Sequence, residues 1–158
     1  MSQASAATAT VHEWLTNLEQ SAGEVFELML NSKLRKGTPQ LFPAPECTAI
    51  VGLAGSTRGL FTFRCGGVTA NQLAATMLRL PSERAAHYSA DALGEVANMI
   101  AGKFKNKTDS TGCRSFLSLP TVVTGTTYTC HSLSSAAPLQ LWFQFRGEPL
   151  QITMQAQI

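Results

Sequence analysis

The stretch CTAIVGLAGSTRGLFTFRC, residues 47–65, decides the fold because it predicts two strands joined by a short turn. β-Branched, aromatic and small apolar residues fill 47–53 and 60–65, and the segment GSTRG at 55–59 separates them. A nucleophile elbow or a phosphate-binding loop at GSTRG would need a helix directly after the turn. A second strand is expected there instead, so the stretch predicts an antiparallel hairpin.

A long amphipathic helix is expected upstream of the hairpin. From Thr10 onward, apolar residues recur at steps of three and four, and Glu13 stands where a capping box would place it. This helix should end before Gly37-Thr38-Pro39. Residues 1–9 are rich in Ser, Ala and Thr and are expected to form a flexible N-terminal tail. Residues 10–158 would then form a single domain.

Two further helices and four strands are expected downstream. Thr69 is a candidate cap for a helix over 70–80 that stops at Pro81, and a third helix is expected from Ser89 to Lys107. The expected strands cover 115–119, 122–130, 139–146 and 150–156. Three helices combined with antiparallel hairpins predict an α+β fold, with the helices packed on an antiparallel or mixed sheet.

The composition of the 158 residues narrows the possible functions. Hydrophobic residues make up 44% of the chain and charged residues only 14%, against a typical charged share of about 25%. This balance excludes a disordered chain and indicates an uncharged face suited to self-association. Twelve Lys and Arg residues with a net charge of +2 are too few for nucleic-acid binding. Neither a secretory signal nor a membrane span is expected.

The cysteines and histidines do not predict a metal or catalytic site. The cysteines are widely spaced, at Cys47, Cys65, Cys113 and Cys130. Zinc sites normally use closely spaced pairs, so we expect these to be small buried residues in a reducing cytoplasm. The histidines stand alone, at His12, His87 and His131. Their spacing gives none of them an orienting partner or a nucleophile.

The third predicted helix carries the candidate chemistry. On a helical wheel its apolar stripe, which must be the buried side, consists of Leu93, Val96, Ala97, Ile100 and Phe104. The opposite face carries Asp91, Gly94, Glu95, Asn98, Ala101, Gly102 and Lys105. Because Glu95 and Asn98 are three residues apart, their side chains should project next to each other.

Small residues surround this polar pair, at Gly94, Ala101 and Gly102. Each glycine inside a helix costs about 0.5–1 kcal/mol relative to alanine. One interpretation is that another molecule must approach this face closely. The other is that the glycines pack on a neighbouring part of the chain and that the polar pair is ordinary surface. Spacing alone leaves both open.

The run DALGEVANMIAG, residues 91–102, resembles the signature helix of the CheX/CheC/FliY phosphatases of bacterial chemotaxis. In that family a Glu-x-x-Asn pair followed by a glycine marks the active helix. The segments SLPTVVTG at 118–125 and GLAGSTRG at 52–59 are similar to the strand after that helix and to the first hairpin. The resemblance covers about Val11 to Met154 and implies a CheC/CheX-like, pseudo-duplicated domain, in which Gly23-Glu24-Val25 echoes residues 94–96.

The resemblance implies a phosphatase that hydrolyses the aspartyl phosphate of a CheY-like receiver domain, in chemotaxis or another two-component pathway. It implies that Asn98 orients the attacking water and that Glu95 pairs with the receiver's lysine. The implied contacts with the receiver are Asp91, Gly94, Ala101, Gly102 and Lys105. The chain would need no cofactor of its own, since the receiver would supply Mg²⁺, and it would act as a cytoplasmic homodimer.

Two departures from the family pattern affect these expectations. CheC-like members carry two Glu-x-x-Asn helices, whereas here Glu24 is followed by Glu27 at the asparagine position, so a single working site is expected. Residues 82–89 lack the acidic lead-in expected before the signature helix. Two other functions stay open: a non-catalytic adaptor that binds a receiver or a flagellar-switch component through the same helix face, and a structural dimerisation domain.

Overall fold

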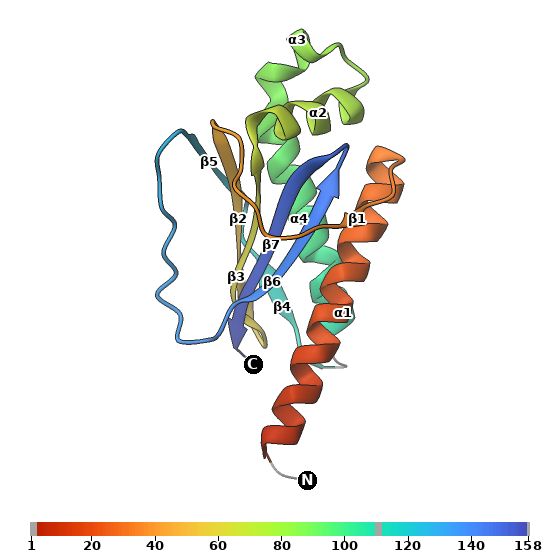
Figure 1. The fold of residues 1–158 in the computed structure, drawn as a ribbon. Helices are drawn as coiled ribbons and strands as arrows, with labels where there is room; N and C mark the ends of the chain where they lie inside the picture. The colour runs from red at the N-terminus through yellow and green to blue at the C-terminus, as the bar shows by residue number, and fades with distance from the viewer. Residues whose placement is uncertain (1–2, 110–111, 158) are drawn as a thin grey trace.

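The computed structural model describes residues 3–109 and 112–157 and shows one antiparallel sheet with helices against one face (Figure 1). The helices are α1 (Gln3–Leu30), α2 (Gly67–Leu78), the short α3 (Ser82–Ala85) with a 3-10 turn (Ala86–Tyr88), and α4 (Ser89–Thr108). The strands are β1 (Arg35–Lys36), β2 (Glu46–Gly55), β3 (Arg58–Gly66), β4 (Ser115–Leu117), β5 (Thr121–Gly125), β6 (Leu139–Phe145) and β7 (Glu148–Gln157). The predicted α+β fold is confirmed.

The predicted hairpin forms the centre of the sheet. Strands β2 and β3 pair antiparallel, with Cys47 opposite Cys65 and Val51 opposite Phe61. The strand order is β1-β6-β7-β3-β2-β4, and β5 also pairs with β2, beyond the point where β4 ends. One edge of the sheet is therefore formed by β4 and β5 in succession, and this edge runs beside α4.

The core lies between the sheet and the helices α1 and α4, with α2 across one end of the helix layer (Figure 1). The predicted apolar stripe of α4 is fully buried: Leu93, Val96, Ala97, Ile100 and Phe104. The Trp14 ring of α1 meets Phe104 edge-on, with ring centroids 5.7 Å apart. Burial of an aromatic or leucine side chain of this size contributes about 1.5–3 kcal/mol. This packing determines which face of α4 points away from the core.

The N-terminal helix differs from the prediction at both ends. It begins at Gln3, so residues 3–9 belong to α1 and Thr10 is not its N-cap; the alanines of this segment favour helix strongly. It ends at Leu30, because Asn31 adopts a left-handed conformation with φ of 47°. The chain then turns back, and residues 35–36 form β1 against β6. Residues 1–2 lie outside the described part.

The boundaries of α2 and β5 also differ from the prediction. Helix α2 begins at Gly67, which places the predicted cap Thr69 inside the helix, buried. The predicted strand 122–130 is paired only as far as Gly125, and the chain from 126 to 138 crosses the face of the sheet opposite the helices. Among the described helices, none combines the length and hydropathy needed to span a membrane.

The cysteine prediction is half correct. Cys47 and Cys65 are buried neighbours on adjacent strands, as expected. Cys113 and Cys130 are exposed, because they lie in the irregular segments that follow α4 and β5. All four are free thiols.

Candidate functional site

Glu95 and Asn98 lie on the face of α4 that points away from the core. Glu95 is exposed and Asn98 is half-buried, whereas the residues between them, Val96 and Ala97, are fully buried. In the described part of the chain neither polar side chain has a hydrogen bond or an ion pair. We call the exposed line of Asp91, Glu95, Asn98 and Gly102 the α4 ridge. A carboxylate and a carboxamide thus stand side by side with their hydrogen-bonding capacity unused.

The small residues next to the ridge do not all face outward. A methyl group placed on Gly94 would lie 3.4 Å from both Pro120 Cγ and Val122 Cγ2, and Gly94 is buried. Ala101 is fully buried as well. The expectation that these two residues offer surface to a partner is therefore wrong. At Gly94 it is the β4–β5 edge that packs against this side of the helix.

Gly102 is the exception among these small residues. It is half-exposed, and the nearest atom to a methyl group placed on it would be Leu117 Cδ1 at 3.7 Å. Gly102 follows Asn98 by one helical turn on the same face. Packing within the described chain therefore does not require a glycine at this position.

The side of α4 turned toward α1 is held by ion pairs. Lys107 Nζ lies 2.9 Å from Glu24 Oε1, and Lys103 Nζ lies 3.2 Å from Glu24 Oε2. The hydrogen bonds from Lys107 and then Lys103 hold the pKa of Glu24 below its usual range. Glu24, the counterpart of Glu95 in the echoed motif, is thus engaged in joining the two helices, while Glu27 is exposed.

The C-terminal end of α4 is fixed by a polar network. Asp109 accepts the Ser115 backbone N–H at 2.9 Å and the Ser115 hydroxyl at 2.6 Å. The Ser115 hydroxyl oxygen accepts the Thr57 N–H at 3.1 Å. Burial alone would raise the pKa of Asp109, but these hydrogen bonds and the charge of Lys105, 3.8 Å away, hold it below the usual value. The network ties α4 to the strand edge and engages Lys105 within the chain.

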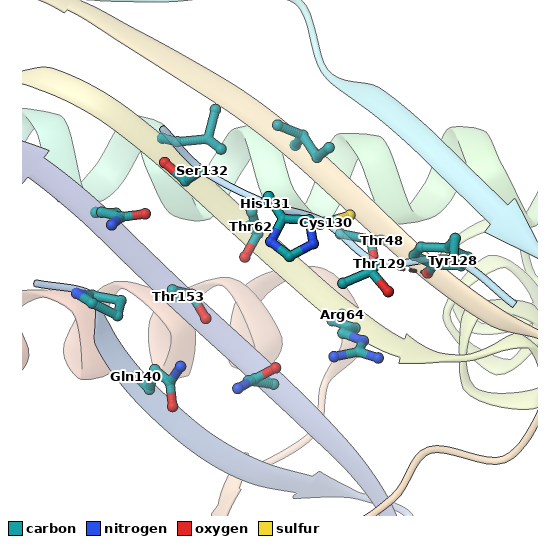
Figure 2. Close-up of a pocket in the computed structure, with 15 residues that line it drawn as sticks. Thr48, Thr62, Arg64, Tyr128, Thr129, Cys130, His131, Ser132, Gln140 and Thr153 are labelled. Carbon is teal, nitrogen blue, oxygen red and sulfur yellow. Dashed lines mark hydrogen bonds between the residues drawn. The ribbon is translucent and has the colours of Figure 1, made fainter. Parts of the chain in front are cut away.

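A cavity of about 560 Å³ lies on the opposite face of the sheet, beneath the 126–138 segment (Figure 2). Figure 2 shows Thr62 and Thr153 on its floor and His131 and Cys130 over them. In the described part of the chain neither His131 nor Cys130 is hydrogen-bonded to a group that would orient it for catalysis. The sequence did not indicate this cavity, because residues 126–130 of the segment that covers it were expected to continue a strand.

Metal binding finds no support in the residues described. No group of three or more His, Cys, Asp or Glu side chains comes together there. The functional groups present at the α4 ridge are the carboxylates of Asp91 and Glu95 and the carboxamide of Asn98.

Three solved proteins have the same fold. A CheC-like superfamily protein from Shewanella sp. PV-4 is 21% identical, with a TM-score of 0.77 over 92% of this chain and 98% of that chain. CheX from Vibrio vulnificus is 20% identical, with a TM-score of 0.76 over 91% and 96% of the two chains. A chain of the CheX–CheY–BeF3–Mg²⁺ complex from Borrelia burgdorferi is 23% identical, with a TM-score of 0.76 over 92% and 98%.

No curated relative matches the sequence. The family model of the chemotaxis phosphatase CheX, however, matches residues 47–144, which is more than half of the chain. The matched range contains the central hairpin, the whole of α4 and the β4–β5 edge. The resemblance inferred from the α4 motif is thereby confirmed, and the chain belongs to the CheX family of chemotaxis phosphatases.

Proposed function

We propose that the protein hydrolyses the aspartyl phosphate of a CheY-like receiver domain at the α4 ridge. Membership of a phosphatase family supports this, as does the similarity to a chain of a solved complex between CheX and CheY. The observation that carries the proposal is the pair Glu95 and Asn98, which is accessible and has no partner in the described part of the chain. The site of chemistry would thus be completed only when the receiver docks.

Asn98 is proposed to orient the attacking water. An acyl phosphate is reactive, so positioning contributes more than a strong base would. A carboxamide is neutral and can both accept and donate hydrogen bonds, so it can hold a water in line without repelling the phosphoryl group. The water oxygen attacks phosphorus, the bond from phosphorus to the aspartyl oxygen breaks, and the products are the free carboxylate and inorganic phosphate.

Glu95 is proposed to dock onto the receiver's lysine. Its carboxylate is exposed and unpaired in the described chain, so docking would break no internal ion pair. Mg²⁺ would be held by the receiver, and Asp91, Gly102 and Lys105 would provide further contacts. Lys105 would have to release or share Asp109, from which it is 3.8 Å. Asp109 would keep its two hydrogen bonds from Ser115 if Lys105 turned toward a receiver, so its carboxylate would not be left unpaired.

We also propose that the protein acts as a cytoplasmic homodimer in chemotaxis or another two-component pathway. The low charged share of 14% supports self-association. Light scattering at micromolar concentration should give twice the mass of one chain, and a monomer mass would contradict the dimer.

Stopped-flow release of phosphate from a phosphorylated receiver of the same organism tests the activity. The parent protein should accelerate release, and Asn98→Ala should lose this acceleration by about 10²–10³-fold, as when one oxyanion donor is removed. Asn98→Ala should keep the parent's circular dichroism and melting curve, because the side chain has no internal partner. Undiminished turnover in Asn98→Ala would refute the assignment. Binding without acceleration, with Glu95→Ala more damaging than Asn98→Ala, would identify an adaptor instead.

A further inference from the structure

The β4–β5 edge runs alongside the α4 ridge in a defined register. Leu117 lies next to Gly102, and Pro120 lies next to Gly94, at the distances given above. The eight residue steps from 94 to 102 span about 12 Å of helix, and the three steps from 117 to 120 span about 10 Å of extended chain. Since Asn98 is midway between the two glycines, Ser118 and Leu119 run past the turn that carries Asn98.

This segment is held rigidly. The Ser118 N–H donates to the Gly52 carbonyl at 2.9 Å, and the Gly52 N–H donates to the Ser118 hydroxyl oxygen at 2.8 Å. The Ser118 hydroxyl in turn donates to the Leu119 carbonyl at 2.9 Å. On the other side Pro120 has a restricted φ and packs against Gly94. Leu119 is therefore fixed between two anchored neighbours.

The Leu119 side chain is nevertheless 88% exposed. A single exposed leucine on a mobile loop would be unremarkable in a soluble protein. Here the backbone that presents it is already ordered, so burying the side chain against a partner would cost little further chain entropy. Removing an apolar side chain of this size from water against a partner contributes about 1.5–3 kcal/mol.

We infer that Leu119 is an apolar anchor for the phosphorylated receiver, a docking and positioning residue distinct from Glu95 and Asn98. This inference rests on the proposed function, because the occupant is the receiver that the α4 ridge would engage. Leu119 buries against the receiver surface next to the phosphorylated aspartate.

The test compares Leu119→Ala with Leu133→Ala. Leu133 is a matched control, because it is 100% exposed but lies in the segment across the opposite face of the sheet. Binding is measured by fluorescence anisotropy with a labelled receiver held in its activated form by beryllofluoride and Mg²⁺, and turnover by stopped-flow phosphate release. Leu119→Ala should raise both Kd and KM about tenfold, with kcat at saturating receiver within about twofold of the parent. Leu119→Met should recover most of the affinity.

The outcomes separate this inference from the proposed function. If the parent binds and hydrolyses but Leu119→Ala behaves as Leu133→Ala does, the anchor is refuted and the phosphatase proposal stands. If the loss in Leu119→Ala falls on kcat with Kd unchanged, docking is not its role and the inference also fails. If the parent neither binds the beryllofluoride-activated receiver nor accelerates phosphate release, the proposed function fails, and the anchor fails with it.

Discussion

Replacing Gly102 with alanine should stabilise the fold and at the same time slow turnover. Glycine in a helix interior is about 1 kcal/mol less favourable than alanine. The new methyl group would meet only Leu117 Cδ1, at the ordinary contact distance of 3.7 Å, so nothing in the chain opposes the gain. For a domain of this size the melting temperature should rise by about 2–4 °C.

The loss of turnover in Gly102→Ala should appear only when the receiver docks. Gly102 lies on the exposed α4 ridge, one turn after Asn98, so a methyl group there would hold the receiver's surface away. Displacing reacting groups by about 1 Å can cost about 10²-fold. We expect kcat/KM for the phosphorylated receiver to fall about 10–100-fold in Gly102→Ala, measured by stopped-flow phosphate release alongside thermal denaturation.

Two matched glycines in the same protein serve as controls. Gly23→Ala in α1 would meet no atom within 4 Å and should gain stability with unchanged turnover. Gly94→Ala is on the signature helix itself, but its methyl group points at Pro120, so turnover should stay within about twofold and the stability gain should be smaller. Equal turnover in all three variants would refute the argument that the receiver approaches at Gly102.

Two further predictions concern stability and reactivity. Asp109→Asn should lower the free energy of unfolding by about 1–3 kcal/mol at pH 7, measured by urea denaturation. Because the folded-state pKa of Asp109 is lowered, its contribution is present above the unfolded-state pKa and is lost as the pH falls through the folded-state pKa, so the parent and the variant should converge in acid. Burial raises the pKa of the Cys47 and Cys65 thiols, so iodoacetamide at pH 8 should modify only Cys113 and Cys130 in the folded protein, as read by mass spectrometry.

One measurement could contradict each of these two predictions. A stability difference between Asp109→Asn and the parent that does not change between pH 7 and pH 3 would show that the carboxylate charge is not what Ser115 and Lys105 stabilise. Modification of Cys47 or Cys65 in native buffer, at a rate near that in denaturant, would contradict their burial in the sheet.

The central hairpin and α4 could be predicted because their burial follows a simple period. In the hairpin, alternate residues such as Val51 and Phe61 face the core, and in α4 the buried stripe recurs every three to four residues. Each pattern depends only on which residues of one element face the apolar core. That spacing can be read from a short stretch of sequence. The family motif lay in the same helix, so the candidate site was predicted together with it.

The burial of Gly94 and Ala101 could not be predicted in this way. A helical wheel orders residues around the axis of their own helix, but it does not say which other segment covers each side. Here Pro120 and Val122 come from a distant part of the sequence and cover the flank next to the ridge. Residues 126–130 were mistaken for a continuation of the strand because their threonines favour β-structure, while pairing partners exist only up to Gly125.

The ion pairs of Glu24 bear on whether α1 could carry a second centre like the one proposed for α4. Glu27→Asn alone would create a Glu-x-x-Asn motif in α1. Lys103 and Lys107 would still be paired with the Glu24 carboxylate that such a centre requires. Freeing it would mean replacing Lys103 and Lys107 on α4, the first of which directly follows Gly102. Such a second centre would therefore need substitutions on both α1 and α4, because the two helices share the Glu24 ion pairs.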